Sequence, residues 1–566
     1  MDGQTRVPDG PAPRAAPDKP GATRGGATGD LVLAASATCA ALAPFLGKPF
    51  HVDDPLFLWL ARRVTTHPLD PFGFEVNWYG ALEPMWSITQ NPPLAGYLIA
   101  AAASVVGWSE AALHGVFLAA SVVAIVATAL LARRCGAPPL ATALATLFTP
   151  AFLVSATTLM CDVPMLALWL VAMLLWMHGI ERDSASLLAA ASVVAALAVL
   201  TKYFAVALVP LLVLWTWRRV RRVDLRIGWL VLPLAVLLGW HLWTASAYGR
   251  GLVGGAIGYA SGAPSPFGRV GSIAVGIAFV GGCLASWAGL LPLACTRRAL
   301  AAFAVAAVLA ALGVTGLGGI GEYRFPAAGW TRWAFVGEAS LFAIGGVAVA
   351  ILAASEWSRR RDADTELLLA WLLGTYFFAA VVNWTANARS VLPLLPPAAI
   401  LLARRIAERA SSAGTLRPRG LAPALVLAAG LSLAVAAADH RLAEAGRAGA
   451  RAAVERAAGR KLWFEGHWGL QWYLEQAGAE AIDFAKSPIR PGDRIAVPSY
   501  NTNLRPLPEA VTRLLEVVAL APPARLTTIH EAVGAGFYAA IATGPLPFGA
   551  GAVPAEEIQV YEAVQP

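Results

Sequence analysis

Long apolar segments that alternate with short, arginine-rich connections run through most of this chain, and this alternation limits its fold more than any other feature. Several segments are near the ~20 residues that a helix needs to cross ~30 Å of hydrocarbon. Only 14% of the residues are charged, against about a quarter in a soluble domain. The sequence therefore predicts a polytopic α-helical membrane protein with about 13 transmembrane helices. The predicted spans are 31–46, 113–132, 138–156, 163–178, 186–201, 204–217, 228–247, 272–294, 299–317, 333–355, 366–384, 390–403 and 421–437.

The two ends of the chain differ from this pattern. Residues 1–30 contain few bulky apolar side chains, so they are expected to form a disordered cytoplasmic tail. Residues 31–437 form the predicted transmembrane domain, with its longest loop at 48–112. From residue 438 onward Arg, Glu and Gly become more frequent. Residues 438–566 are therefore predicted to form a small soluble domain of the α/β or α+β class.

Two segments of the expected C-terminal domain resemble strands, and one resembles a helix. The strand-like segments are Arg494–Pro498 and Ile558–Val560, and the helical pattern covers Leu470–Ala479. The aromatic-rich stretch Trp463–Tyr473 favours docking onto the membrane domain, with sugar binding as the alternative. His467 by itself gives no catalytic signal.

The basic residues are distributed unevenly between the two sets of loops. If the N-terminus is cytoplasmic, the tail and the cytoplasmic loops hold 22 Lys and Arg, and the outer segments before residue 438 hold nine. This is the asymmetry expected from the positive-inside rule. It places the loop 48–112 and the C-terminal domain outside the cytoplasm. The net charge of +8 then reflects membrane topology, so we expect no nucleic-acid partner.

The five cysteines are scattered and have neither disulfide nor zinc-ligand spacing. The sequence establishes no cofactor and no metal site, although a divalent metal would be compatible with its carboxylates.

The predicted outer loop 48–112 combines carboxylates with aromatic residues, as sugar-handling surfaces do. Ionisable residues near lipid are costly, so such a cluster suggests a functional site. The alternative is an interfacial re-entrant loop, because Trp and Tyr favour headgroup depth in any case. The polar members are His51, Asp53, Asp54, Asp70, Glu75, Glu83 and Asn91, and the aromatic members include Trp59, Trp78, Tyr79 and Trp86.

Asp53 and Asp54 are the catalytic candidates in this loop. Asp54 precedes Pro55, a pattern typical of a helix N-cap followed by proline at the first helical position. A cap needs only one side chain, which leaves Asp53 without a structural role. Asp53 is therefore the better candidate for a general base.

Further polar motifs fall at the outer ends of predicted spans. Asp162 either caps the fourth span or lines a substrate cavity. Lys202, followed by Tyr203, either extends to the interface or pairs with a lipid phosphate. Arg389 occupies a comparable position. Lys202 and Arg389 together would form a phosphate clamp that faces Asp53.

The order of these motifs resembles that of the GT-C membrane glycosyltransferases. The motifs are the acidic pair Asp53-Asp54, Pro-Pro-Leu-x-x-Tyr-Leu at 92–98, Asp162, Leu-Thr-Lys at 200–202, and Arg389 before Leu-Pro-Leu-Leu-Pro. They are similar to those of glycosyltransferase family 39, which includes the protein O-mannosyltransferases and the lipid A aminoarabinose transferase. The resemblance covers about residues 40–405.

The resemblance implies an inverting transferase that moves a hexosyl or pentosyl unit from a polyprenyl-phosphate donor to an acceptor hydroxyl. The acceptor would be an envelope lipid, a glycan or a protein at the outer side of the cytoplasmic membrane, and membrane lipids would surround the enzyme. Asp53 matches the family's catalytic acid. Lys202, with Tyr203, and Arg389 match positions that contact the leaving phosphate.

The resemblance also bears on the substrate cavity and on the donor. Asp162 matches an acid that organises the cavity, and His51, Glu83 and Asn91 are its other candidate residues. Relatives commonly carry His or Lys where this chain has Asn91, which removes one cation from the expected donor site. The alternative from another class is a secondary transporter or flippase, but those tend to show repeated halves and no repeat is visible here.

Overall fold

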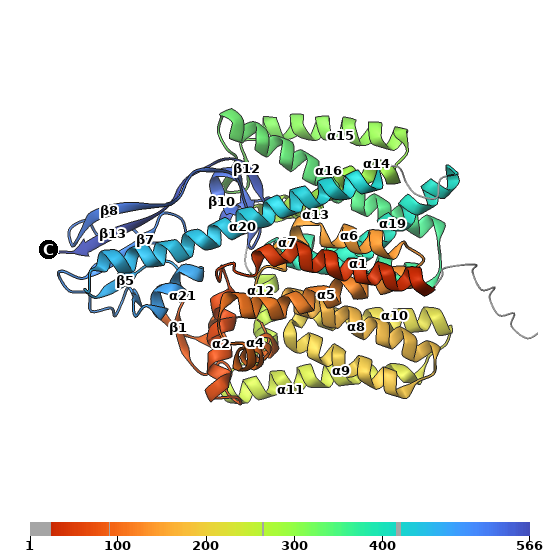
Figure 1. The fold of residues 1–566 in the computed structure, drawn as a ribbon, viewed down its shortest axis with the longest axis horizontal. Coiled ribbons are helices and arrows are strands. Elements are labelled where there is room, and N and C mark those ends of the chain that lie inside the picture. The colour runs from red at the N-terminus through yellow and green to blue at the C-terminus, as the bar shows by residue number, and fades with distance from the viewer. Residues whose placement is uncertain (1–23, 90, 263–264, 415–419, 566) are drawn as a thin grey trace, which may run out of the picture.

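The computed structural model describes residues 24–89, 91–262, 265–414 and 420–565, and within them ten helices are long and apolar enough to cross a membrane. Three shorter apolar helices accompany them. Figure 1 shows helices packed side by side, with a mixed sheet at one end. This confirms the polytopic α-helical fold, and the count of 13 spans stays a prediction. The principal helices are α1 (Arg24–Leu42), α4 (Leu94–Val106), α5 (Glu110–Arg134), α8 (Asp162–Glu181), α9 (Ala185–Thr201), α10 (Leu208–Val220), α11 (Val231–Tyr248), α13 (Gly268–Cys283), α15 (Arg297–Gly316), α16 (Gly329–Arg359), α17 (Ala363–Phe377), α19 (Leu395–Ser412) and α20 (Leu421–Ala457).

Burial differs sharply between helices of similar apolarity. α8 packs against α5 and α9, and its Trp169 and Trp176 are fully buried. α15 has no buried residue among its 20. A helix that is apolar on all sides is either enclosed by protein or surrounded by lipid. The structure thus separates central helices from helices that face the membrane, which composition alone does not do.

Several predicted boundaries are wrong, for identifiable reasons. The predicted span 138–156 consists of two short helices, α6 (Pro139–Leu147) and α7 (Pro150–Ser155). Pro150 has no amide hydrogen to continue the first helix, and the Thr149 side chain caps α7 by accepting from Phe152 N–H. The loop predicted at 48–112 contains the apolar helix α4, which the sequence analysis missed. The expected tail at 1–30 lies outside the described residues up to 23, and α1 begins within it.

The C-terminal region contains a five-stranded mixed sheet in the order β6-β5-β7-β13-β8. β5 pairs in parallel with β6 and β7, whereas β13 is antiparallel to β7 and β8. Both predicted strands and the predicted helix are present, the helix as α21 (Trp468–Gln476). This arrangement belongs to the predicted α/β or α+β class. The strands are β5 (Leu462–Phe464), β6 (Glu480–Ala481), β7 (Arg494–Pro498), β8 (Thr512–Ala521) and β13 (Glu556–Ala563).

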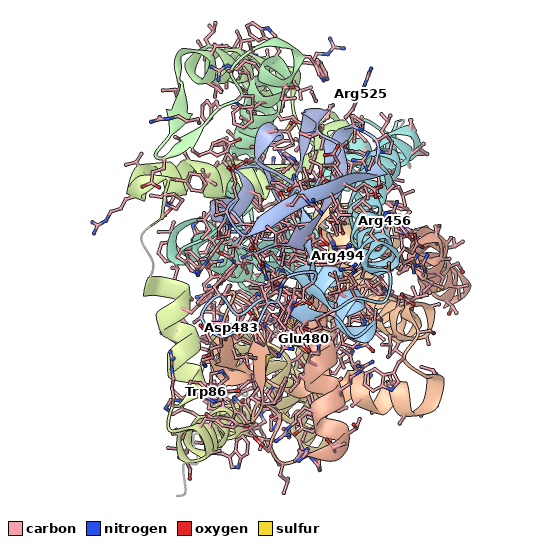
Figure 2. The ribbon with its side chains drawn as sticks, turned by 90° about the vertical axis from the view of Figure 1, so that its left-hand side faces the viewer. Trp86, Arg456, Glu480, Asp483, Arg494 and Arg525 are labelled. Atoms are coloured by element: carbon pink, nitrogen blue, oxygen red, sulfur yellow. The ribbon has the colours of Figure 1, made fainter. Side chains whose placement is uncertain are left out.

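α20 joins the helical bundle to the sheet without a break. It runs on for 20 residues past the boundary expected at 437, and its far end packs on the sheet through small residues such as Ala453 and Ala457. α21 packs against α2 (Asp54–Thr66), where Trp472 contacts Trp59. Figure 2 looks onto this end, where Glu480, Asp483 and Arg494 are labelled, and Asn77 Nδ2 of the segment 48–112 donates to Ile482 O at 2.9 Å. The sheet region therefore lies next to the loop that carries the candidate acids.

Candidate active site

The first candidate pair joins two residues that are 336 positions apart. Arg389 Nη1 lies 2.8 Å from Asp53 Oδ2. Asp53 immediately precedes α2, and Arg389 belongs to the short helix α18 (Ala388–Val391). The side chains are 28% and 18% exposed. Both side chains are therefore partly accessible to solvent, and the structure brings Asp53 and Arg389 together as the sequence predicts.

A second pair joins Lys202 to Asp162. The Lys202 ammonium makes an ion pair with Asp162 Oδ1. Asp162 is the first residue of α8 and is buried, whereas Lys202 follows the last residue of α9 and remains partly exposed. Within the part of the chain that the structure describes, no side chain caps the start of α8, so Asp162 does not serve as its cap. Lys202 thus contacts a carboxylate at the helix ends instead of extending alone toward the interface.

The segment before α8 connects the two pairs. Met160 Sδ lies 3.0 Å from Arg389 Nη1, and Cys161 Sγ donates to Asn91 Oδ1 at 3.4 Å. Asp162 is also close enough to Arg389 for an electrostatic interaction. Two carboxylates, two cations and the Asn91 amide therefore form one cluster. We call it the charge cluster: Asp53, Arg389, Asp162, Lys202 and Asn91.

The structure corrects the role expected for Asp54. Helix α2 has no side-chain cap, and the fully buried Asp54 accepts hydrogen bonds from two backbone amides instead. His51 N–H donates to Oδ2 at 2.9 Å, and Leu159 N–H donates to Oδ1 at 2.8 Å. Asp54 thus ties the segment before α2 to the turn between α7 and α8. The cap prediction failed because a distant backbone amide competes for the same oxygens.

The other predicted site residues lie around the charge cluster or apart from it. The Tyr203 hydroxyl accepts a hydrogen bond from Trp240 Nε1 at 2.8 Å. Glu83 lies on the short strand β2 (Leu82–Pro84), opposite Val76. Both Glu83 and Asp53 are within electrostatic range of Tyr79, and burial raises the pKa of this phenol to about 12.

Sequence analysis missed a fully buried ion pair. Lys48 Nζ lies 2.5 Å from Asp439 Oδ2, and both side chains are 0% exposed. The Thr528 hydroxyl donates to Asp439 Oδ1 at 2.6 Å, and the Tyr538 hydroxyl donates to Oδ2 at 2.9 Å. The sequence offered one signal: Asp439 is the first charged residue of α20 and directly follows its apolar run.

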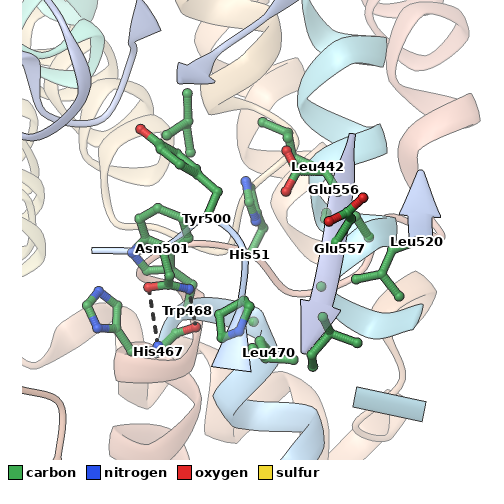
Figure 3. Close-up of a pocket in the computed structure, with 17 residues that line it drawn as sticks. His51, Leu442, His467, Trp468, Leu470, Tyr500, Asn501, Leu520, Glu556 and Glu557 are labelled. Atoms are coloured by element: carbon green, nitrogen blue, oxygen red, sulfur yellow. Dashed lines mark hydrogen bonds between the residues drawn. The ribbon is translucent and has the colours of Figure 1, made fainter. Parts of the chain in front are cut away.

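A pocket lies beside this buried pair, between α20 and the C-terminal sheet (Figure 3). His51, Trp468 and Glu556 line it, and Asn501 holds the neighbouring loop through hydrogen bonds with the backbone of His467. Burial lowers the pKa of His51 to about 4 and that of His467 to about 3. Both imidazoles are therefore neutral near pH 7, so neither is poised to donate a proton from a charged form.

Among the described residues, no group of three or more His, Cys, Asp and Glu side chains is arranged to hold a metal ion.

Three solved structures of other proteins show distant likenesses to this chain. ArnT from Cupriavidus metallidurans bound to undecaprenyl phosphate is 15% identical, with a TM-score of 0.40 over 83% of this chain and 93% of that chain. The archaeal oligosaccharyltransferase AglB from Archaeoglobus fulgidus, in complex with an inhibitory peptide and a dolichol-phosphate, is 14% identical, with a TM-score of 0.46 over 81% and 64%. The S. cerevisiae protein O-mannosyltransferase Pmt1-Pmt2 complex bound to the sugar donor is 15% identical, with a TM-score of 0.30 over 43% and 36%.

Comparison with protein families is more informative. A search of curated proteins finds no match. Residues 90–243 match the model of the dolichyl-phosphate-mannose-protein mannosyltransferase family, and this stretch contains Asn91, Asp162 and Lys202. The match supports a membrane glycosyltransferase over a transporter or flippase. It also confirms the resemblance seen in the sequence: residues 90–243 are similar to the dolichyl-phosphate-mannose-protein mannosyltransferases, a family of GT-C glycosyltransferases.

Proposed function

We propose that this protein transfers a hexosyl or pentosyl unit from a polyprenyl-phosphate donor to an acceptor hydroxyl at the outer side of the cytoplasmic membrane. The observation that carries the proposal is the charge cluster, in which two carboxylates and two cations meet at the ends of apolar helices. Ionisable groups at such a position are costly and generally serve a function. The acceptor would be an envelope lipid, a glycan or a protein.

Arg389 and Lys202 are the proposed phosphate ligands. Each contacts a carboxylate. A phosphate that enters the cluster competes with those carboxylates, and a guanidinium can bind it through two parallel hydrogen bonds. These cations would also stabilise the negative charge that develops on the leaving phosphate in the transition state.

Asp53 is the proposed general base. When the phosphate draws Arg389 away, the Asp53 carboxylate becomes free to accept the proton of the acceptor hydroxyl. The acceptor oxygen then forms a bond to the anomeric carbon while the bond from that carbon to the phosphate oxygen breaks. The polyprenyl phosphate leaves from the opposite face, so the anomeric configuration inverts.

The orientation in the membrane follows from the basic residues at the two ends of the bundle. Arg134 pairs with Glu181, and Arg218 pairs with Glu366, at the ends of α5, α8, α10 and α17. These helices carry the arginine-rich loops that favour the cytoplasm. The charge cluster and the C-terminal sheet region would then lie outside. Reporter fusions after Arg222 should read cytoplasmic, and fusions after Asp493 should read extracytoplasmic; a cytoplasmic signal at Asp493 would contradict this orientation.

The donor class can be tested with purified protein in nanodiscs. We expect sugar transfer from a polyprenyl-phosphate sugar and none from a nucleotide sugar, since nucleotide sugars are cytoplasmic compounds and the proposed site faces the other side. The readout is radiolabelled sugar released from the lipid fraction. The Lys202→Gln and Arg389→Gln variants are matched controls, because each removes one proposed phosphate ligand. Turnover of a nucleotide sugar without polyprenyl lipid would refute the donor assignment.

A further inference from the structure

A segment of the C-terminal region reaches back and fixes the loop that carries Arg389. The Ala388 N–H donates to Phe537 O at 2.9 Å, and the Ala540 N–H donates to Ala386 O at 2.9 Å. These backbone hydrogen bonds hold the residues just before Arg389 against residues about 150 positions later in the chain. Arg389 is therefore placed by the C-terminal region as well as by the helical bundle.

Tyr538 lies against the guanidinium itself. The Arg389 Cζ atom is 5.7 Å from the centroid of the Tyr538 ring, and Arg389 Nη2 approaches Tyr538 O at 3.5 Å. A guanidinium within ~6 Å of a ring face is attracted by the ring quadrupole. Since Asp53 binds Nη1, Arg389 is held by one exchangeable partner, the Asp53 carboxylate, and by one fixed partner, the tyrosine.

The buried ion pair in turn holds Tyr538. The Tyr538 hydroxyl donates to Asp439, which pairs with Lys48. The Tyr538 and His51 rings pack edge to face, with their centroids 6.0 Å apart. Tyr538 is itself buried, with 6% exposure. The ring therefore has little freedom, and it offers Arg389 a rigid surface.

We propose that Tyr538 is a positioning residue, which keeps the Arg389 guanidinium aimed at the donor phosphate and so makes the C-terminal region part of the transferase site. The inference rests on the proposed function of Arg389. When the phosphate replaces Asp53 as the anionic partner, the ring contact persists and limits the rotamers open to the arginine. A ligand held in its productive geometry before binding loses less conformational entropy, which raises affinity.

The test is the affinity for polyprenyl phosphate, measured in nanodiscs by direct binding and so independent of turnover. Tyr538→Leu should weaken binding about tenfold because it removes the ring. Tyr538→Phe keeps the ring and should stay within about threefold of the wild type. Tyr561→Phe is the matched control, since it removes a hydroxyl in the same region that donates to Gln559. If Tyr538→Leu does not accumulate, Tyr538→Met takes its place, because the flexible methionine side chain adapts to irregular gaps in a core.

The same measurement in an Arg389→Ala background separates positioning from a general structural effect. We expect Tyr538→Leu to add less than a twofold loss there, because the group that it positions is gone. An equal loss in both backgrounds, or no loss in the wild-type background, would overturn the inference. If Arg389→Ala itself leaves binding unchanged, the proposed phosphate role of Arg389 fails, and that failure is visible before any Tyr538 variant is considered.

Discussion

Two ion pairs next to the C-terminal region have similar chemistry and opposite surroundings. Asp53 and Arg389 keep 28% and 18% of their side chains exposed, whereas Lys48 and Asp439 keep none. A charge pair with access to solvent can exchange one partner for a substrate. A sealed pair cannot do so without leaving the other charge buried and unpaired. This difference in accessibility supports the catalytic role that we propose for the first pair and a structural role for the second, and Tyr538 contacts both pairs.

The largest expected effect is on activity at the accessible pair. Asp53→Asn keeps shape and polarity but removes the base, so the rate should fall about 10²–10⁴-fold, or about 3 to 5 kcal/mol of barrier. Thermal unfolding should stay near that of the wild type because no cavity opens. The measurement is the initial rate per amount of protein in the same membranes. An active Asp53→Asn variant would place the base elsewhere.

At the buried pair Lys48–Asp439, a substitution should lower the stability of the protein. Lys48→Met leaves the Asp439 carboxylate buried without its cation, which typically costs about 3 to 5 kcal/mol. The double variant Lys48→Met with Asp439→Leu should recover much of that loss, because no charge stays unpaired. Thermal unfolding of all three proteins in detergent provides the check. A single variant as stable as the wild type would mean that the pair is not sealed from water.

Low pH should also destabilise the protein through two buried histidines, His51 and His467. The pKa of buried His51 is lowered to about 4 and that of His467 to about 3, below the ordinary value of 6.5. The unfolded chain then binds more protons than the folded one between pH 6.5 and these values, so stability falls as the pH drops. At pH 5 each histidine should contribute a loss of about 2 kcal/mol relative to pH 7. His51→Gln should reduce the pH dependence of the melting temperature; an unchanged slope would show that His51 is not the group titrating.

Asp54 provides an intermediate case. Both of its oxygens accept backbone N–H groups, and an asparagine can accept only with its single oxygen. Asp54→Asn should therefore destabilise the protein by about 1 to 3 kcal/mol and lower activity only through the folded fraction. Rates corrected for folded protein should match the wild type. A corrected rate as low as that of Asp53→Asn would reverse the assignment of the two acids.

The smallest effect is expected at an exposed ion pair of the C-terminal sheet region, outside the charge cluster. Lys461 pairs with Glu480, and their side chains are 37% and 58% exposed. Exposed pairs contribute about 0 to 1 kcal/mol, so Lys461→Gln should change neither the melting temperature by more than a few degrees nor the rate. It sets the scale for the other variants. A large loss of stability or rate in Lys461→Gln would show that side-chain exposure does not predict how much each ion pair contributes.

The sequence alone determined the class of the molecule. Apolar segments of membrane length and the bias of basic residues predicted a polytopic helical protein, because both signals are local and additive along the chain. The order of short motifs predicted the glycosyltransferase family. Asp53, Asp162, Lys202 and Arg389 were identified as candidates because charges at the ends of apolar segments are rare enough to be noticed individually.

Only the tertiary structure decided which of these charges are partners. Asp53 meets Arg389 across 336 positions and Asp162 meets Lys202 across 40, and both pairings depend on helix packing. Packing likewise gave Asp54 Oδ1 to the distant Leu159 amide and enclosed Lys48 with Asp439. Sequence records which groups are charged, whereas solvent access and the choice of partner depend on the neighbours that the fold assembles, and these decide whether a charge serves catalysis or architecture.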